Sequence, residues 1–209
     1  MSFPLPAFRS RVRPVIVLAD AAQAVPLARA LLAGGVDVME ITLRSEAGLK
    51  SIEAVAREVP QMQVGAGTVT RADEVRRVQE AGARFALSPG MTDALAEAVK
   101  QARMPFVPGV MTPGAVMRAR DHGFSLLKLF PAAQAGGLGM LKALAGPFAE
   151  LRFCPTGGVT QANLGEFLAL PNVSLVGGSW LTPTELVNAG RWEEITALAR
   201  AATEATSQT

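Results

Sequence analysis

The stretch Val36-Asp-Val-Met-Glu-Ile-Thr-Leu-Arg44 shows how this chain of 209 residues is organised. Its mostly apolar composition predicts a buried strand at residues 36–43. The pair Gly34-Gly35 is typical of the end of a preceding helix, and the apolar side chains within residues 52–59 are spaced as one stripe of a following helix. The stretch therefore predicts a strand followed by a helix, which is the unit from which parallel sheets are built.

The same unit recurs along the chain, with strand starts separated by roughly twenty to twenty-seven residues. The predicted strands cover residues 14–18, 36–43, 63–65, 84–88, 105–108, 125–130, 151–154 and 173–176. Eight strands that alternate with helices predict an α/β protein, a (β/α)8 TIM barrel that forms a single domain over residues 1–209. A doubly wound open sheet is the alternative, because the chain is short for a barrel.

The composition agrees with closely packed layers. Hydrophobic residues make up 49% and aromatic residues only 5%, so the core must be built from aliphatic side chains, as suits helices against a buried parallel sheet. The formal net charge is +2 and the basic residues are scattered, which argues against a nucleic-acid partner. Arg9, Arg11 and Arg13 alternate with Ser10 and Val12 and are predicted to form an exposed arm.

The chain has one cysteine, Cys154, so it cannot build a disulfide framework or a cysteine-based metal cluster alone. We expect Cys154 to fill space in the core, and we expect no metal and no other cofactor. No signal-peptide pattern is present, and no apolar stretch approaches the ~20 residues of a membrane span. These patterns predict a cytoplasmic protein without a membrane partner.

Chemistry in a barrel is expected at the carboxyl ends of the strands. Lys128 lies in the apolar strand Phe124-Ser-Leu-Leu-Lys-Leu-Phe-Pro131, close to that end, and should be buried. Burial lowers the pKa of an amine, and the neutral amine can attack a ketone to form an imine. The alternative is a lysine that pairs with a buried carboxylate for packing alone.

Glu40 is an acid inside another apolar strand, and it should project toward the same strand ends. We expect surroundings that raise its pKa and let it carry protons, although a simple ion pair with Lys128 is also compatible with the pattern. Arg44 ends the same strand and suits a bidentate contact with a substrate carboxylate, while taken alone it would be an ordinary surface arginine.

Other strand ends carry weaker signals. Thr68 follows two glycines that would let the backbone approach a ligand, and Pro89 shapes the next strand end. Two glycine pairs, Thr156-Gly157-Gly158 and Gly177-Gly178-Ser179, follow the last two predicted strands, where barrels hold phosphate. Exposed backbone N–H groups and a short helix starting near Ser179 would bind the anion there, and tight turns are the alternative.

Taken together, these motifs resemble the 2-keto-3-deoxy-6-phosphogluconate aldolases, many of which also act on 2-keto-4-hydroxyglutarate. The resemblance runs from about residue 14 to residue 202, and its motifs form an ordered set. They are Pro14-Val-Ile-Val17, Glu40-Ile-Thr-Leu-Arg44, Val64-Gly-Ala-Gly-Thr68, Ser88-Pro-Gly90, Lys128-Leu-Phe-Pro131, Gly146-Pro-Phe148, Arg152-Phe-Cys-Pro-Thr-Gly-Gly158 and Gly177-Gly-Ser-Trp180.

The resemblance implies a homotrimeric barrel that needs no metal, in which Lys128 forms the imine and Glu40 handles protons. It further implies that Arg44 and Thr68 bind the pyruvate half of the substrate. The remaining residues implied at the site are two that line it, Pro89 and Phe130, and six that hold the distal polar end, Thr156, Gly157, Gly158, Gly177, Gly178 and Ser179.

The expected reaction is the cleavage of 2-keto-3-deoxy-6-phosphogluconate to pyruvate and glyceraldehyde 3-phosphate. Cleavage of 4-hydroxy-2-oxoglutarate to pyruvate and glyoxylate is a further expected activity. A sugar-phosphate isomerase or epimerase, with Glu40 as base and Lys128 as an electrostatic stabiliser, is the rival enzyme and would form no imine. A barrel that only senses a sugar phosphate would not need a lysine and a glutamate together.

Overall fold

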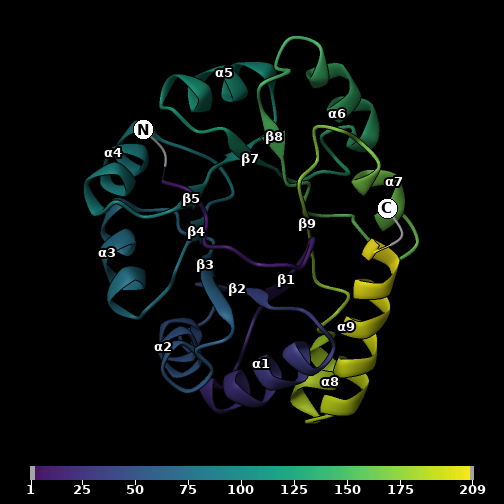
Figure 1. The fold of residues 1–209 in the computed structure, drawn as a ribbon. Coiled ribbons are helices and arrows are strands. Elements are labelled where there is room, and N and C mark those ends of the chain that lie inside the picture. Colours follow the sequence, from purple (N-terminus) through teal and green to yellow (C-terminus); the bar gives the residue numbers. More distant parts are fainter. Residues whose placement is uncertain (1–2, 208–209) are drawn as a thin grey trace.

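Parallel strands form the centre of the protein in the computed structural model, which describes residues 3–207. They lie around the middle of the molecule, with the helices outside them (Figure 1). The strands of the described residues are β1 Val12–Ile16, β2 Val38–Thr42, β3 Gln63–Gly67, β4 Ala86–Leu87, β5 Phe106–Val107, β6 Gly109–Val110, β7 Leu126–Leu129, β8 Arg152–Phe153 and β9 Val176–Gly178. The predicted α/β class with parallel strands is confirmed.

The helices follow the strands in alternation, as the sequence pattern predicts. Thr92 and Thr112 show how the chain starts them, because each hydroxyl accepts a hydrogen bond at 3.2 Å from the backbone N–H three residues later. The helices are α1 Ala24–Ala33, α2 Gly48–Glu58, α3 Ala72–Glu80, α4 Asp93–Ala102, α5 Pro113–Asp121, α6 Gly137–Ala145, α7 Leu164–Leu168, α8 Thr184–Asn188 and α9 Trp192–Ser207, with a short 3-10 turn at Ala21–Gln23.

The strand predicted at residues 105–108 is two strands in the structure, β5 and β6, which Pro108 separates. Proline has no backbone N–H to donate to a ladder, and pairing changes partner at this point, from β4 before Pro108 to β7 after it. The strand predicted at residues 173–176 lies later, as β9, and Val173 pairs only through an isolated bridge with Phe153.

The strands divide into a six-stranded sheet in the order β5-β4-β3-β2-β1-β9 and a three-stranded sheet in the order β6-β7-β8. The larger sheet is curled (Figure 1). Two isolated parallel bridges, Phe153 to Val173 and Thr156 to Gly177, connect the segments around β8 and β9. Because the ladders belong to two sheets, strand pairing confirms a curled parallel sheet but not a closed eight-stranded barrel.

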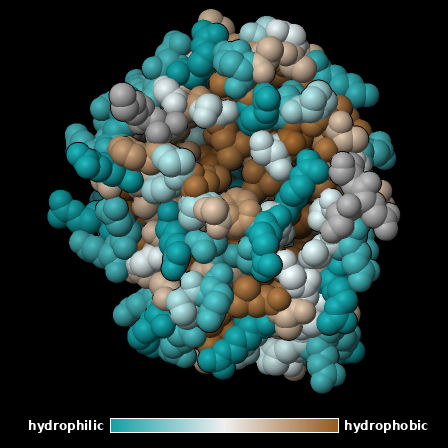
Figure 2. Space-filling view, in the orientation of Figure 1, coloured by the Kyte–Doolittle hydropathy of each residue, from teal (hydrophilic) through white to brown (hydrophobic). Residues whose placement is uncertain are grey.

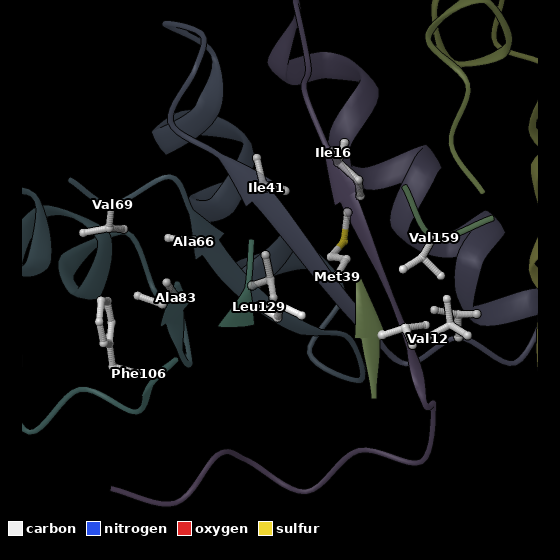
Figure 3. Close-up of a cluster of buried hydrophobic side chains, with 14 of the residues drawn as sticks. Val12, Ile16, Met39, Ile41, Ala66, Val69, Ala83, Phe106, Leu129 and Val159 are labelled. Atoms are coloured by element: carbon white, nitrogen blue, oxygen red, sulfur yellow. The ribbon is translucent and has the colours of Figure 1, made fainter. Parts of the chain in front are cut away.

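Aliphatic side chains fill the core, as the composition predicts. Figure 3 shows Ile16, Met39 and Ile41 close together between neighbouring strands, and all three are at most 1% exposed. A smaller cluster joins Val38, Phe85, Leu87 and Val107 to side chains of the N-terminal segment. Phe8 of that segment packs on Phe85 with ring centroids 6.4 Å apart, so the segment covers apolar side chains of the strands.

Polar side chains dominate the outer parts of the face in Figure 2, and apolar ones gather toward its middle. Among residues 3–207, no helix has both the length and the apolar composition that would let it cross a membrane. The cytoplasmic location stays a prediction.

Candidate active site

Lys128 of β7 and Glu40 of β2 meet inside the protein, although 88 residues separate them in the chain. The Lys128 Nζ atom lies 3.3 Å from Glu40 Oε1 and donates a hydrogen bond to it. Lys128 is 4% exposed and Glu40 is fully buried, so the predicted burial of Lys128 is confirmed. The Phe130 ring lies beside the amine, with its centroid 5.0 Å from Nζ.

Arg13 completes this group, and the sequence prediction for it was wrong. It was expected in an exposed arm, but it is 1% exposed, and its Nε lies 2.9 Å from Glu40 Oε2 in an ion pair. Its Nη2 atom donates to the Thr156 hydroxyl at 3.3 Å. The reason is that β1 begins at Val12, earlier than predicted, and side chains two apart share one face, so Arg13 points the same way as Val15.

The charges of this group set the protonation states of the pair. Burial raises the pKa of the Glu40 carboxyl, but the neighbouring charges of Arg13 and Lys128 outweigh burial and hold that pKa below its ordinary value. The expectation of a raised pKa was therefore wrong, because it did not include Arg13. Glu40 rests as a carboxylate, which is the form of a base.

Burial lowers the pKa of the Lys128 amine, and the Glu40 carboxylate opposes this effect without cancelling it. This direction agrees with the sequence prediction. A lowered pKa gives a larger fraction of neutral amine at a given pH, and the neutral amine is the form that attacks a carbonyl carbon. The pair therefore places an amine of lowered pKa within hydrogen-bonding distance of a carboxylate.

Glycines make room for these side chains. A Cβ atom on Gly67 of β3 would collide with the Glu40 carboxylate, and one on Gly177 of β9 would collide with the Thr156 hydroxyl and the Arg13 guanidinium. Neither position could hold a larger residue without displacing the buried charges. The glycines of the predicted motifs are therefore required by close approach of side chains as well as by turns.

A cavity of about 200 Å³, here named the inner cavity, is bounded by Phe130, whose ring lies beside the Lys128 amine, and by Thr156, which accepts a hydrogen bond from Arg13. It gathers seven of the residues predicted for substrate binding, and two further residues, Val15 and Val159, that the sequence analysis did not name. The seven are Arg44, Phe130, Thr156, Gly157, Gly158, Gly178 and Ser179.

The loop after β8 turns through two successive glycines. Gly157 and Gly158 both have positive φ, 91° and 88°, which glycine adopts without strain. The helix expected near Ser179 is absent from that position, because α8 begins at Thr184, and Ser179 instead accepts a backbone hydrogen bond from Thr182 in a turn. The dipole contribution expected there was therefore wrong, while the backbone groups and the hydroxyl remain.

Three residues predicted for substrate binding lie near the strand ends without lining the inner cavity: Thr68, Pro89 and Gly177. Lys128 and Glu40 do not line it either. Thr68 has φ of 60°, a left-handed conformation that is unfavourable for threonine and that tends to occur at functional sites. The Pro89 backbone packs closely against Gly109 of β6. The binding roles of all the predicted residues stay predictions, as does the absence of a metal or cofactor.

Known proteins resemble this chain along nearly its whole length. The sequence model of the family described as KDPG and KHG aldolase matches residues 7–198. The 2-dehydro-3-deoxy-phosphogluconate aldolase of Pseudoalteromonas atlantica is 49% identical over 191 residues, which cover 91% of this chain and 89% of the relative.

Solved structures of KDPG aldolases are also similar to the structure of this chain. A crystal structure of the KDPG aldolase of Legionella pneumophila, with pyruvate captured as a covalent carbinolamine intermediate, has a TM-score of 0.91 and 44% identity, covering 93% of this chain and 94% of that one. The enzyme of Zymomonas mobilis ZM4, crystallised with 3-phosphoglycerate, has a TM-score of 0.87 and 42% identity, covering 93% and 91%. The predicted resemblance is confirmed, and this chain belongs to the KDPG and KHG aldolase family.

Proposed function

We propose that the protein is a Schiff-base aldolase that cleaves 2-keto-3-deoxy-6-phosphogluconate (KDPG) to pyruvate and glyceraldehyde 3-phosphate. The observation that carries this proposal is the buried pair of Lys128 and Glu40, whose Nζ and Oε1 atoms lie 3.3 Å apart. Membership of the aldolase family supports it, as does the pyruvate carbinolamine in the Legionella enzyme.

The neutral amine of Lys128 attacks the C2 ketone of the substrate and forms a carbinolamine, which loses water to give a protonated imine. The Glu40 carboxylate then takes the proton of the C4 hydroxyl through a water molecule. The bond between C3 and C4 breaks, its electron pair moves toward the imine nitrogen, and the aldehyde leaves. Protonation of the resulting enamine at C3 and hydrolysis of the imine release pyruvate and restore Lys128.

The imine accelerates this reaction because positive charge on nitrogen accepts the electron pair far more readily than a neutral ketone does. In the resting protein the Arg13 guanidinium holds Glu40 ionised, so the base is ready before the substrate arrives. Once Glu40 has accepted a proton it becomes the acid that returns one to the enamine, so a single residue serves both half-reactions.

The inner cavity and the strand ends beside it hold the rest of the substrate in this proposal. Arg44 and Thr68 bind the pyruvate carboxylate, and Pro89 and Phe130 line the reacting carbon atoms. The phosphate lies at Thr156-Gly157-Gly158 and Gly177-Gly178-Ser179. The N–H groups of Thr156 and Gly177 already donate to Leu129 and Pro155, so the backbone of Gly157 and Gly158 and the Ser179 hydroxyl are the groups that favour the anion. The 3-phosphoglycerate in the Zymomonas relative supports a phosphorylated three-carbon ligand.

Cleavage of 2-keto-4-hydroxyglutarate (KHG) is a second proposed activity, supported by the description of the family. That substrate shares the keto acid half on which Lys128 and Glu40 act, and it carries a carboxylate where KDPG carries the phosphorylated part. A site whose distal end binds anions through backbone groups accommodates both.

The experiment that tests the imine is reduction with borohydride in the presence of pyruvate, followed by peptide mass spectrometry. We expect inactivation and a reduced pyruvyl group on Lys128, and neither in a Lys128→Met variant. An adduct on Lys50, Lys100 or Lys142, or no adduct, would contradict the proposal. An isomerase or epimerase would form no imine, so the same experiment separates the rival enzyme.

We also propose that the two sheets belong to one (β/α)8 barrel, formed as a single domain. The bridges at Phe153 and Thr156 support closure between β8 and β9, and the direct succession of β5 and β6 around Pro108 supports closure on the other side. A homotrimer is proposed from the family resemblance. Sedimentation equilibrium would give its mass, and a monomer would contradict it.

A further inference from the structure

A second cavity, of about 350 Å³, lies beside the inner cavity and is here named the rim cavity. Its walls are the loop of residues 43–46 after β2, together with Leu49 of α2 and the first turns of α3. The two cavities share one side chain, Arg44. The rim cavity is therefore next to the position at which the proposed reaction holds the keto acid.

Three guanidinium groups line the rim cavity: Arg44 from the β2 loop, and Arg71 and Arg77 from α3 and its start. Within residues 3–207, neither Arg44 nor Arg77 forms an ion pair with a carboxylate. Two arginines outside any ion pair thus converge on one hollow, from two elements that are not adjacent in sequence, and Arg44 also acts on the Glu40 carboxylate at longer range.

The acidic residues of the rim cavity do not cancel this charge. Glu74 is committed to the start of α3, where its Oε2 atom accepts hydrogen bonds from the backbone N–H groups of Thr70 at 2.7 Å and Arg71 at 3.1 Å. Its other oxygen lies 3.4 Å from the Arg71 guanidinium. Arg71 also forms an ion pair with Asp73 at 3.4 Å, so its charge is already paired. Glu46 is exposed, which leaves Arg44 and Arg77 as the guanidinium groups of the rim cavity that belong to no ion pair among the described residues.

We propose that the rim cavity binds a small phosphate anion, and that this anion competes with the keto acid for Arg44. Guanidinium groups match phosphate oxygens in pairs, and Arg44 and Arg77 around one hollow, with Arg71 beside them, give a site that a single surface arginine does not. Because the contacts are exposed to solvent, we expect weak binding, with a dissociation constant of about 1–10 mM.

The link between the sites follows from the shared side chain. An Arg44 guanidinium drawn toward an anion in the rim cavity cannot at the same time make its full contact with a carboxylate in the inner cavity. Such coupling is reciprocal, so phosphate weakens keto acid binding by the same factor by which the keto acid weakens phosphate binding. This inference rests on the proposed function, in which Arg44 binds the pyruvate carboxylate.

The test is the rate of cyanoborohydride trapping of pyruvate on Lys128, measured against pyruvate concentration at increasing inorganic phosphate. Ionic strength is held constant with sodium chloride. We expect saturating phosphate to raise the pyruvate concentration at half-maximal rate by about fivefold without lowering the maximal rate. The quantity compared between variants is a ratio: the pyruvate concentration at half-maximal rate with saturating phosphate, divided by the same concentration without phosphate.

Arg77→Ala should reduce the ratio toward one, and Arg76→Ala is its matched control. Arg76 is the neighbouring residue of the same helix and is also exposed, but it lines a different hollow, between α3 and α4. The Arg76→Ala substitution therefore removes one positive charge from the protein, as Arg77→Ala does, but leaves the charge of the rim cavity unchanged. A Ser179→Asp variant, which disfavours phosphate in the inner cavity, should keep the full ratio.

Each result decides the matter. An undiminished ratio in Arg77→Ala, an equal reduction in Arg76→Ala, or loss of the effect in Ser179→Asp would overturn the rim cavity as the phosphate site. Trapping that proceeds but does not respond to phosphate in the wild type would overturn this inference and leave the proposed function standing. Absence of trapping in phosphate-free buffer would contradict the proposed function itself, and this inference with it.

Discussion

The Arg13 guanidinium lies 2.9 Å from the Glu40 carboxylate, on the side opposite to Lys128, so that one buried anion is held between two basic side chains. This relationship explains why Glu40 rests ionised in a site that solvent hardly reaches. It also connects the base to the distal part of the inner cavity, because Arg13 donates a hydrogen bond to Thr156.

Arg13→Met should destabilise the protein by about 3–5 kcal/mol, because it leaves the buried Glu40 carboxylate with Lys128 as its remaining ion-pair partner. It should also raise the pKa of Glu40 and of Lys128, because Arg13 lowers both. Urea unfolding measures the first effect, and the pH profile of pyruvate trapping measures the second. Arg13→Lys keeps the charge and should move the profile less. Identical profiles for Arg13→Met and the wild type would show that Arg13 only fills space.

Glu40→Gln keeps the size of the side chain and removes the titratable group. Turnover of KDPG should fall by about 10²- to 10⁴-fold, the usual contribution of a general acid-base group. Exchange of the pyruvate methyl protons with solvent, which reports enamine formation without carbon-carbon cleavage, should fall as well. Near-normal cleavage and exchange would show that Glu40 is only a structural partner of Lys128.

The rate of imine trapping should rise with pH through the pKa of Lys128, and the midpoint should lie below 10.5, because burial lowers that pKa. The Glu40 carboxylate raises the same pKa, so Glu40→Gln should move the midpoint to still lower pH. Trapping rates over a pH series, with the fold checked by circular dichroism, give both midpoints. A midpoint that moves upward in the variant would contradict the assigned charges.

Glu40 should also make stability depend on pH. Its pKa is lowered in the folded protein from an ordinary value of 4.5, so the unfolded chain takes up the proton first as the pH falls. The stabilisation of the fold by ionised Glu40 is therefore fully present above the pKa that Glu40 has in the unfolded chain. It is lost as the pH falls through the lower pKa that Glu40 has in the folded protein. The difference in unfolding free energy between wild type and Glu40→Gln should be smaller at about pH 3 than at about pH 7. An unchanged difference would mean that Glu40 has the same pKa in both states.

Ser179→Asp should lower kcat/KM for KDPG by at least about tenfold more than for KHG, because like charges brought together cost several kcal/mol and phosphate carries more charge than a carboxylate. Ser179→Asn has nearly the same size without the charge and serves as control. Steady-state kinetics with both substrates give the comparison. Equal losses for the two substrates would place the phosphate elsewhere.

Gly67→Ala should abolish most activity, since the added methyl group collides with the Glu40 carboxylate, and overpacking of this kind costs about 1–3 kcal/mol. Gly139→Ala in α6 is the matched control, because nothing lies within 4 Å of its added Cβ. The control should keep both activity and stability. Wild-type kinetics in Gly67→Ala would show that the carboxylate can move without losing its function.

The sequence by itself determined the elements and their order. The strand predicted at residues 36–43 is observed as Val38–Thr42, because the composition of a strand and the glycines that end a helix are properties of neighbouring residues. The burial of Lys128 could be predicted for the same reason, since it is flanked by apolar residues on both sides. The family was recognisable because its motifs are short and stand in a characteristic order.

Only the tertiary structure decided which charges meet. Arg13, Glu40 and Lys128 come from β1, β2 and β7, and no local pattern reports that their side chains share one interior space. The pKa of Glu40 was mispredicted for this reason, because a pKa depends on every charge within a few ångströms, wherever it lies in the chain. The break at Pro108 and the contact of Arg44 with two cavities are likewise set by pairing and packing between distant segments, which the sequence specifies only through the folded whole.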